Sequence, residues 1–223
     1  MHRLLAALGA FLVGLAIFLF LTAGSVLLFM SPAFVAHEYA QPSFPPAELY
    51  SATDRLRLAQ ETVRYLNGGR DVAVRLRDMR HDGQPVYNER EVQHLVDVWM
   101  VVYWLRWAWR LAALILGVAL VLAIWVPGWR VPVARGLFRG SAALVATLLT
   151  ILISALLSFD WFFVRFHQVF FASGTWIFDY TDSLIQFYPV EFWMDATWKL
   201  GAAILVEAVA VGGLALTWLG RGR

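Results

Sequence analysis

Four long apolar runs constrain this chain more than any other feature of its sequence. Each is long enough to cross a hydrocarbon core of about 30 Å as one helix. Of the 223 residues, 60% are hydrophobic and 15% are charged, whereas about a quarter of a soluble domain is charged. The sequence therefore predicts an α-helical membrane protein with four transmembrane helices, over residues 1–30, 98–126, 140–159 and 193–218. The first run is far longer than the roughly 7–15 apolar residues of a cleaved signal peptide, so we expect it to be retained.

Charge divides the remaining segments into two groups. The start of the chain, the 127–139 loop and the 219–223 tail carry basic and no acidic side chains: Arg3, Arg130, Arg135, Arg139, Arg221 and Arg223. Segments 31–97 and 160–192 hold most of the Asp and Glu residues. The positive-inside rule then predicts that both termini are cytoplasmic and that the two long segments lie outside.

Segment 31–97 is long enough to form a small extracytoplasmic α+β cap. Prolines at 42, 45 and 46 separate it from the first apolar run. Ser51 resembles a helix N-cap, and apolar residues follow at helical spacing: Leu56, Ala59, Val63 and Leu66. Asn67-Gly68-Gly69 predicts the end of that helix, because glycine readily takes the left-handed conformation there.

The second half of this segment predicts the β part of the cap. Val72, Val74 and Leu76 alternate with other side chains, which is typical of a short strand. Asp82-Gly83 is a hairpin turn signal. The charges of the cap nearly balance, so nothing in it indicates binding to nucleic acid.

Asn88, with Glu91 three residues later, forms a capping-box pattern at the start of a helix. No breaker follows before the second apolar run, so one long helix should emerge from the membrane. His94 and Asp97 share a face of that helix. The functional interpretation is that Asp97 orients His94 and fixes its tautomer. The alternative is an ordinary solvated helix end.

Segment 160–192 is unusually aromatic. An interfacial belt explains its tryptophans, but the density of phenylalanines around residues 159–171 indicates a segment at the bilayer edge or the lining of an apolar pocket. Asp160 and His167 are two helical turns apart and could share a face. Asp179 and Asp182 resemble the acidic start of a further helix.

His94 and His167 each lie where an outer segment meets a predicted membrane helix, on the same side of the bilayer. Histidine is the side chain whose ordinary pKa lies near neutral pH, so it can act as a base and then as an acid. Such a pair suits chemistry on a lipid-borne group close to its headgroup.

Charges inside the apolar runs need partners or exits. Arg110 and Glu207 lie at similar depths, roughly 18–20 Å from the outer boundary at 1.5 Å per residue, so we expect them to pair. Arg106 is shallower. It could contact an incoming lipid phosphate or carbonyl, or serve in packing alone.

The sequence excludes some other kinds of functional site and leaves two as alternatives. The chain has no cysteine, which excludes a cysteine nucleophile and thiolate ligands. It also lacks Gly-x-Ser-x-Gly and His-Glu-x-x-His. A metal site built from His94, Asp97 and His167 is compatible in ligand type. Haem ligation by the two histidines in a four-helix bundle is a further alternative.

The histidine motifs resemble those of the bacterial lipoprotein intramolecular transacylase (Lit) family, a group of small four-helix integral membrane proteins. The matching fragments are Asn88-Glu89-Arg90-Glu91, His94-Leu95-Val96-Asp97-Val98, Phe166-His167-Gln168-Val169-Phe170-Phe171, Trp176, Asp179, Asp182, Leu184-Ile185 and Pro189-Val190-Glu191-Phe192. The chain departs from the family pattern at Tyr180, where proline is expected, and at Trp99, where many members carry lysine.

This resemblance implies an activity. Such enzymes move the sn-2 acyl chain of a diacylglyceryl-cysteine lipoprotein from the glycerol oxygen onto the α-amine of the same cysteine. It implies His94 and His167 as the catalytic pair, with Asp97 as the orienting carboxylate. We expect His94 as the base on the amine and His167 at the departing oxygen or the oxyanion, although the two roles could be reversed. Expected substrate contacts are Arg106, Arg165, Phe166, Phe170, Trp176, Asp179 and Asp182.

The same resemblance implies no metal or organic cofactor, a diacylated lipoprotein and membrane lipid as partners, and a monomer in the bacterial inner membrane with its site on the extracytoplasmic face. Two alternatives stay open. One is a non-catalytic membrane scaffold or lipid-binding protein, and the other is a histidine-dependent enzyme acting on a different lipid.

Overall fold

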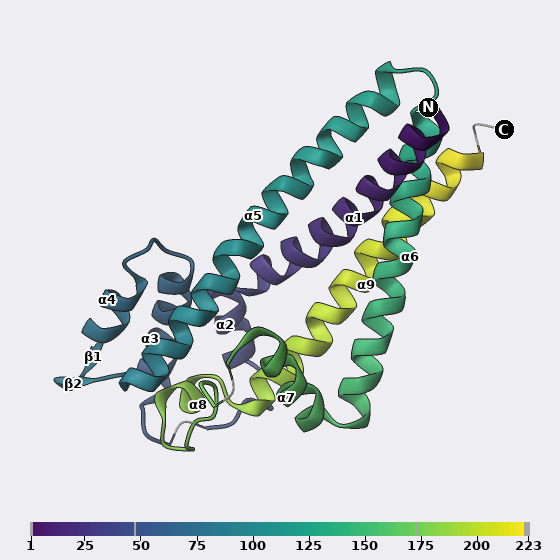
Figure 1. Ribbon diagram of the computed structural model, residues 1–223. Coiled ribbons are helices and arrows are strands. Elements are labelled where there is room, and N and C mark those ends of the chain that lie inside the picture. Colours follow the sequence, from purple (N-terminus) through teal and green to yellow (C-terminus); the bar gives the residue numbers. More distant parts are fainter. Residues whose placement is uncertain (1, 47, 173, 221–223) are drawn as a thin grey trace. The chain divides into compact units, whose positions relative to one another are not determined.

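The computed structural model describes residues 2–46, 48–172 and 174–220 (Figure 1). Its helices and strands are α1 (His2–Phe29), α2 (Pro32–Tyr39), α3 (Ala52–Leu66), α4 (Val72–Asp78), β1 (Arg80–His81), β2 (Gln84–Pro85), α5 (Glu89–Trp125), α6 (Arg130–Leu157), α7 (Phe159–Phe170), α8 (Ser183–Phe187) and α9 (Val190–Gly220). The chain divides into unit 1, residues 1–26, 105–153 and 199–223, and unit 2, residues 27–104 and 154–198.

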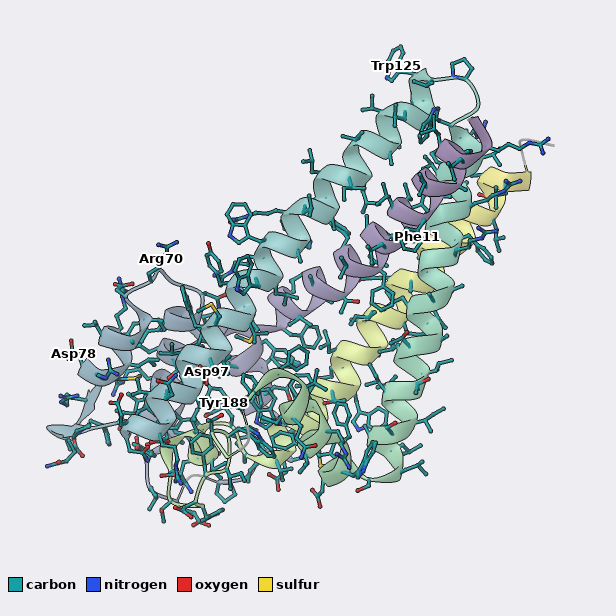
Figure 2. All side chains as sticks on the ribbon, in the orientation of Figure 1. Phe11, Arg70, Asp78, Asp97, Trp125 and Tyr188 are labelled. Atoms are coloured by element: carbon teal, nitrogen blue, oxygen red, sulfur yellow. The ribbon has the colours of Figure 1, made fainter. Side chains whose placement is uncertain are left out.

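Four helices in the described ranges are long and apolar enough to cross a membrane: Arg3–Phe29, Glu89–Trp125, Arg130–Leu157 and Val190–Gly220. Large apolar side chains on them are exposed, including Phe11 at 68% and Trp125 at 78% (Figure 2). Lipid tails can cover such surfaces, whereas water would leave them unfavourably solvated. The prediction of four membrane helices is confirmed.

Unit 1 is held together by close helix packing. One apolar cluster joins residues of α1, α6 and α9: Ile17, Leu21, Leu144, Leu148, Ile204 and Ala208. Gly136 and Gly140 of α6 lie against the backbone of α1, so that a Cβ on either would collide with the carbonyl oxygen of Ala10 or of Gly14. Small residues allow membrane helices to approach this closely.

The start of α1, the end of α9 and the turn between α5 and α6 lie at one end of unit 1 (Figure 1). This arrangement agrees with the prediction that these segments share one side of the bilayer. Arg221 and Arg223, which belong to the same prediction, lie outside the described residues. Because α6 begins at Arg130, most of the predicted 127–139 loop is helical.

The predicted pairing of Arg110 with Glu207 is wrong. Glu207 accepts a hydrogen bond from the Ser25 hydroxyl at 2.9 Å, and the Arg110 guanidinium lies 5.1 Å from the ring centre of Trp107. No ion pair joins the two charges in the part of the chain that the structure describes. A similar depth along two helices does not make their side chains face each other.

Unit 2 contains a core like that of a soluble protein. It combines residues from α3, α4, the first turns of α5, and α8, with Leu58, Leu76 and Phe187 fully buried. Ser51 caps α3 by accepting a hydrogen bond from the Asp54 backbone N–H, as predicted. A turn at Asp82-Gly83 is present as predicted, but it joins the two-residue antiparallel strands β1 and β2 and not the strand predicted at residues 72–76.

One local prediction for the cap is wrong, and a second is right about where helix α3 ends but wrong about the conformation that ends it. Residues 72–76 were predicted as a strand but belong to helix α4. Val72 and Leu76 are buried, while Val74 is 58% exposed. A helix buries positions four apart, whereas a strand would have buried all three. At the end of α3, Asn67 ends the helix in right-handed conformation, and its side-chain amide donates to the carbonyl of Val63. No left-handed glycine is therefore needed there.

Candidate active site

His94 and His167 come together in unit 2, although they belong to different helices. Their ring centres are 6.2 Å apart, and the ring planes are inclined by 25°. His94 lies on the second turn of α5 and is 8% exposed, while His167 lies in the last turn of α7. The structure therefore brings together the two residues that the sequence motifs singled out.

An aromatic shell surrounds the two imidazoles. Phe171 lies 4.9 Å from the His94 ring and 5.6 Å from the His167 ring. Phe178 lies 5.3 Å from His94, and Trp176 lies 4.8 Å from His167. These rings limit the access of water to the pair and form apolar walls suited to a lipid substrate.

The start of α5 is anchored by the predicted capping box. The Asn88 N–H donates to the Glu91 carboxylate at 2.8 Å, and the Glu91 N–H donates to the Asn88 side chain at 3.0 Å. Glu91 is only 2% exposed, and its second oxygen accepts the Leu184 N–H of α8. The turn before His94 is thus bound to a segment far away in the sequence.

His167 is oriented by its own helix. Its Nδ1 lies 2.8 Å from the carbonyl oxygen of Phe163, and because a carbonyl oxygen only accepts, Nδ1 carries the proton. Nε2 of the neutral ring then has the free electron pair. Burial lowers the pKa of His167, and the hydrogen bond to Phe163 opposes that shift only in part. The neutral form is favoured at neutral pH, so His167 can accept a proton there.

The predicted contact between Asp97 and His94 is not formed. Asp97, labelled on α5 in Figure 2, accepts a hydrogen bond from the Gln93 side chain at 3.2 Å. Nδ1 of His94 is buried and has no hydrogen-bond partner within the described ranges. A spacing of three residues places side chains on one face but does not choose rotamers that meet.

Asp179 and Asp182 both pair with Arg90 at the start of α5. Arg90 lies 2.8 Å from the Asp182 carboxylate and 3.4 Å from that of Asp179. Its guanidinium also lies 5.4 Å from the ring centre of Phe178. The two aspartates therefore hold the loop that carries Phe178 against the start of α5.

The remaining predicted substrate contacts are dispersed. Arg165 bonds to Gln168 and lies over the Trp161 ring. Phe166 and Phe170 are 4.9 Å apart on α7 and about half exposed. Arg106 belongs to unit 1, twelve positions after His94 along α5.

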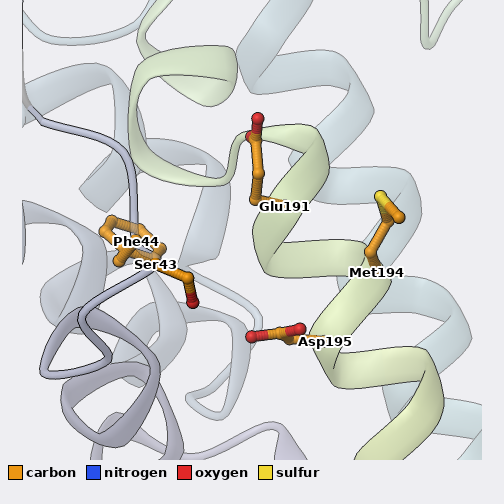
Figure 3. Close-up of a pocket in the computed structure, with 5 residues that line it drawn as sticks. All are labelled: Ser43, Phe44, Glu191, Met194 and Asp195. Atoms are coloured by element: carbon orange, nitrogen blue, oxygen red, sulfur yellow. The ribbon is translucent and has the colours of Figure 1, made fainter.

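A cavity of about 130 Å³ is lined by other residues of unit 2: Ser43, Phe44, Glu191, Met194 and Asp195 (Figure 3). It shares no residue with the histidine pair or its aromatic shell. Across the described residues, no group of three or more His, Cys, Asp or Glu side chains has a metal-binding arrangement.

Sequence reasoning missed several members of the site. Phe163, Phe171 and Phe178 lie within an aromatic run in which nothing distinguishes a ring that contacts histidine from one that faces lipid. Arg90 belongs to the Asn88–Glu91 motif, but its role depends on Asp179 and Asp182, about 90 positions later.

A model of the lipoprotein intramolecular transacylase Lit family matches residues 10–193. A protein of Aquifex aeolicus described only as uncharacterized is 28% identical over 175 residues, which is 75% of this chain and 74% of that protein.

The in meso structure of the membrane-integral lipoprotein intramolecular transacylase Lit from Bacillus cereus has the same fold, with a TM-score of 0.70 and 18% identity over 98% of each chain. Structures of that protein with one histidine replaced by arginine or by alanine give TM-scores of 0.64 at 18% identity. They match 100% of this chain and 95% and 97% of their own chains, respectively. The family match, four membrane helices and a shared fold lead to one conclusion: this chain is a multi-pass membrane protein that belongs to the lipoprotein intramolecular transacylase (Lit) family.

Proposed function

We propose that this protein moves the sn-2 acyl chain of a diacylglyceryl-cysteine lipoprotein from the glycerol oxygen onto the α-amine of the same cysteine. The product is an N-acyl lyso-lipoprotein. The observation that carries the proposal is the meeting of His94 and His167, with ring centres 6.2 Å apart inside an aromatic shell. Membership of the transacylase family supports the reaction class.

The need for two histidines follows from the protons of the substrate. An α-amino group has an ordinary pKa of about 7.7–8.0, so it arrives mainly as an ammonium ion with one proton too many to attack. As the amine attacks and becomes an amide, it loses two protons. One proton belongs on the departing glycerol oxygen, and the other is released to water.

His94 and His167, both neutral at the start, each take one of these protons. His94 removes the first, which frees the amine to attack the ester carbonyl carbon. Nε2 of His167 removes the second as the new C–N bond forms, since its Nδ1 is held by Phe163. The C–O bond to glycerol then breaks, and protonated His94 donates to the departing oxygen. His167 finally releases its proton to water.

These roles differ in part from the assignment expected from the sequence, because His94 takes the first proton of the amine but also protonates the departing oxygen, and His167 is the base at the attack step. Among the described residues, His94 has no carboxylate partner that would make it the oriented base, whereas the Phe163 carbonyl orients His167. Asp97 has no part in the proposed mechanism, because it bonds to Gln93.

Donor and acceptor belong to one substrate molecule, so the enzyme's main contribution is to hold the amine near the ester carbonyl, a step worth several kcal/mol. Phe166 and Phe170, half exposed on α7, are proposed to contact the acyl chains. All groups come from one chain, so a monomer suffices. The proposed site lies on the extracytoplasmic face of the bacterial inner membrane.

The test is the mass and fragmentation of a reporter lipoprotein's N-terminal lipopeptide, isolated from cells lacking other N-acylating enzymes. Wild type should leave the mass unchanged and move an acyl fragment from glycerol to the cysteine nitrogen. His94→Ala and His167→Ala should abolish this transfer. The control is His37→Ala, since His37 is an exposed histidine of α2 that bonds to Gln41.

A gain of one acyl mass would show transfer from a separate phospholipid and contradict the intramolecular reaction. An unmodified lipopeptide from folded, inserted wild-type protein would contradict the proposed function and favour the non-catalytic scaffold.

A further inference from the structure

Trp176 carries a polar group that the proposed mechanism has not used. The indole N–H can only donate a hydrogen bond. In this structure the Nε1 atom is buried and has no acceptor within residues 2–46, 48–172 and 174–220. Buried donors are nearly always satisfied in folded proteins, so an unsatisfied one calls for an explanation, such as a partner that arrives with a ligand.

This unsatisfied donor lies beside the histidine pair. The Trp176 ring centre is 4.8 Å from that of His167, with the planes inclined by 33°. Two residues later, Phe178 packs 5.3 Å from His94. A group bound between the imidazoles would therefore have the Trp176 indole as a neighbour.

The loop that carries Trp176 is held by specific bonds. The Thr175 N–H donates to the Ala172 carbonyl, and the Asp179 N–H donates to the Asp182 carboxylate. Arg90 then pairs with Asp182 at 2.8 Å. Because these contacts flank Trp176, its N–H is positioned before substrate binds, and such preorganisation is what makes a donor effective in catalysis.

We propose that Trp176 Nε1–H donates a hydrogen bond to the ester carbonyl oxygen of the substrate and stabilises the oxyanion that develops on it. This inference rests on the proposed acyl transfer. When the amine nitrogen forms its bond to the carbonyl carbon, the π electron pair of the C=O bond moves onto the oxygen. The pair returns as the C–O bond to glycerol breaks, and the Trp176 proton stays on nitrogen throughout.

An indole suits this task better than a third imidazole. It keeps its proton at any pH in which the protein is folded, so it cannot compete with His94 or His167 for the protons of the amine. It also stays apolar over most of its surface, which suits a site for acyl chains.

The experiment replaces the N–H alone. Site-specific incorporation of 3-benzothienylalanine at position 176 substitutes sulfur for the indole N–H and keeps the size and flatness of the ring. Purified full-length protein is assayed on a synthetic diacylated lipopeptide in mixed micelles, with the N-acyl lyso product separated by chromatography. We expect kcat to fall about 100-fold and KM to change by less than about threefold, because the bond strengthens as charge develops.

The matched control places the same analogue at Trp161, an exposed tryptophan of α7 whose ring lies under Arg165. There kcat should stay at the wild-type value. A second variant, Trp176→His, supplies a ring N–H again and should recover part of the rate that Trp176→Phe loses.

A wild-type kcat with the analogue at 176 would overturn the inference, as would a rise in KM with kcat unchanged, which would make Trp176 a binding residue only. Failure of the underlying function has another signature, because wild-type protein would then form no N-acyl lyso product at all. A loss confined to Trp176→Phe and not reproduced by the analogue would show a packing role and also overturn the inference.

Discussion

His94 and His167, the two histidines of the candidate site, lie on helical segments that are attached to the rest of unit 2 in opposite ways. The first turns of α5 hold His94 through a capping box and a buried carboxylate bonded to α8. Helix α7, by contrast, has no buried residue, and it presents Phe166, Val169 and Phe170 as exposed apolar side chains. One half of the site is built into a core, while the other rests on aromatic contacts and a surface suited to lipid.

This contrast indicates that the first turns of α5 hold their histidine in a fixed position, whereas helix α7 can adjust its position. A site for lipids needs a fixed reference point for the reacting atoms and a pliable wall for acyl chains. His94 belongs to the fixed part because its turn is bound from both sides. The hydrogen bond that orients His167 comes from its own helix, through the Phe163 carbonyl. Four predictions test or sharpen this comparison, and they run from the largest expected effect to the smallest.

The stability of the fixed half of the site, the first turns of α5 with His94, should depend on Glu91. Glu91→Ala removes a buried acceptor of two backbone N–H groups, and we expect it to lower the free energy of unfolding of unit 2 by about 3 kcal/mol. The measurement is a denaturant titration in detergent micelles followed by tryptophan fluorescence. The control is Glu89→Ala, two residues earlier, whose ion pair with Arg77 is exposed to solvent. Equal losses in the two variants would show that Glu91 is no anchor.

The contact between the two halves should depend on Phe171, whose ring touches both imidazoles. Phe171→Ala lets the histidines separate, so we expect kcat to fall about tenfold, in line with the sensitivity of catalysis to small displacements. The measurement is the initial rate of lipopeptide isomerisation. Ile177→Ala, in the exposed part of the same region, should leave the rate unchanged. An unaltered rate in Phe171→Ala would mean that other contacts suffice to hold the pair.

The pH dependence of kcat/KM tests the adaptable half of the site, helix α7 with His167. His167 must be neutral to accept a proton, and burial lowers its pKa. Protonation on the acid side therefore removes activity only below the ordinary histidine pKa of about 6.5. The acid limb of kcat/KM should have its midpoint under pH 6.5, and kcat/KM should fall at least tenfold per pH unit beyond it. A midpoint above pH 6.5 would contradict a neutral, desolvated His167.

The smallest effect is expected at Arg90, which ties the loop of Phe178 to α5 from an exposed position. Arg90→Gln should lower kcat about threefold, because exposed ion pairs contribute little individually. Arg77→Gln is the control, since its exposed pair with Glu89 does not involve that loop. High salt should reproduce the loss in wild type but add nothing to Arg90→Gln, and any further loss in the variant would assign the salt effect elsewhere.

The apolar runs and the capping box predicted the membrane helices and the long α5 because both signals are local and strong. Predictions that required a choice between two periodicities were less secure. Val72, Val74 and Leu76 fit a strand, but the pair Val72 and Leu76 equally fits a helix. The packing of α3 and α5 around these residues favoured the helix.

The site could be predicted only in part. The motifs identified His94 and His167, but the partners of their rings come from contacts between distant segments. The pairing of Arg90 with Asp182 has no sequence signature. The spacing of Asp97 allows a contact with His94 three residues earlier or with Gln93 four residues earlier, and does not choose between them. The orientation of His167 by Phe163 depends on a rotamer, which helical spacing leaves undecided.

The bond between Glu91 and the Leu184 N–H also has a consequence for biosynthesis. Its partners are 93 positions apart, so a growing chain contains His94 long before residue 184 has been translated. Until α8 arrives, the Glu91 carboxylate lacks its second donor, and His94 lacks the facing ring of His167. The candidate site is thus among the last parts of the protein to form, and a chain that has not been translated past residue 184 lacks the arrangement on which the proposed activity depends.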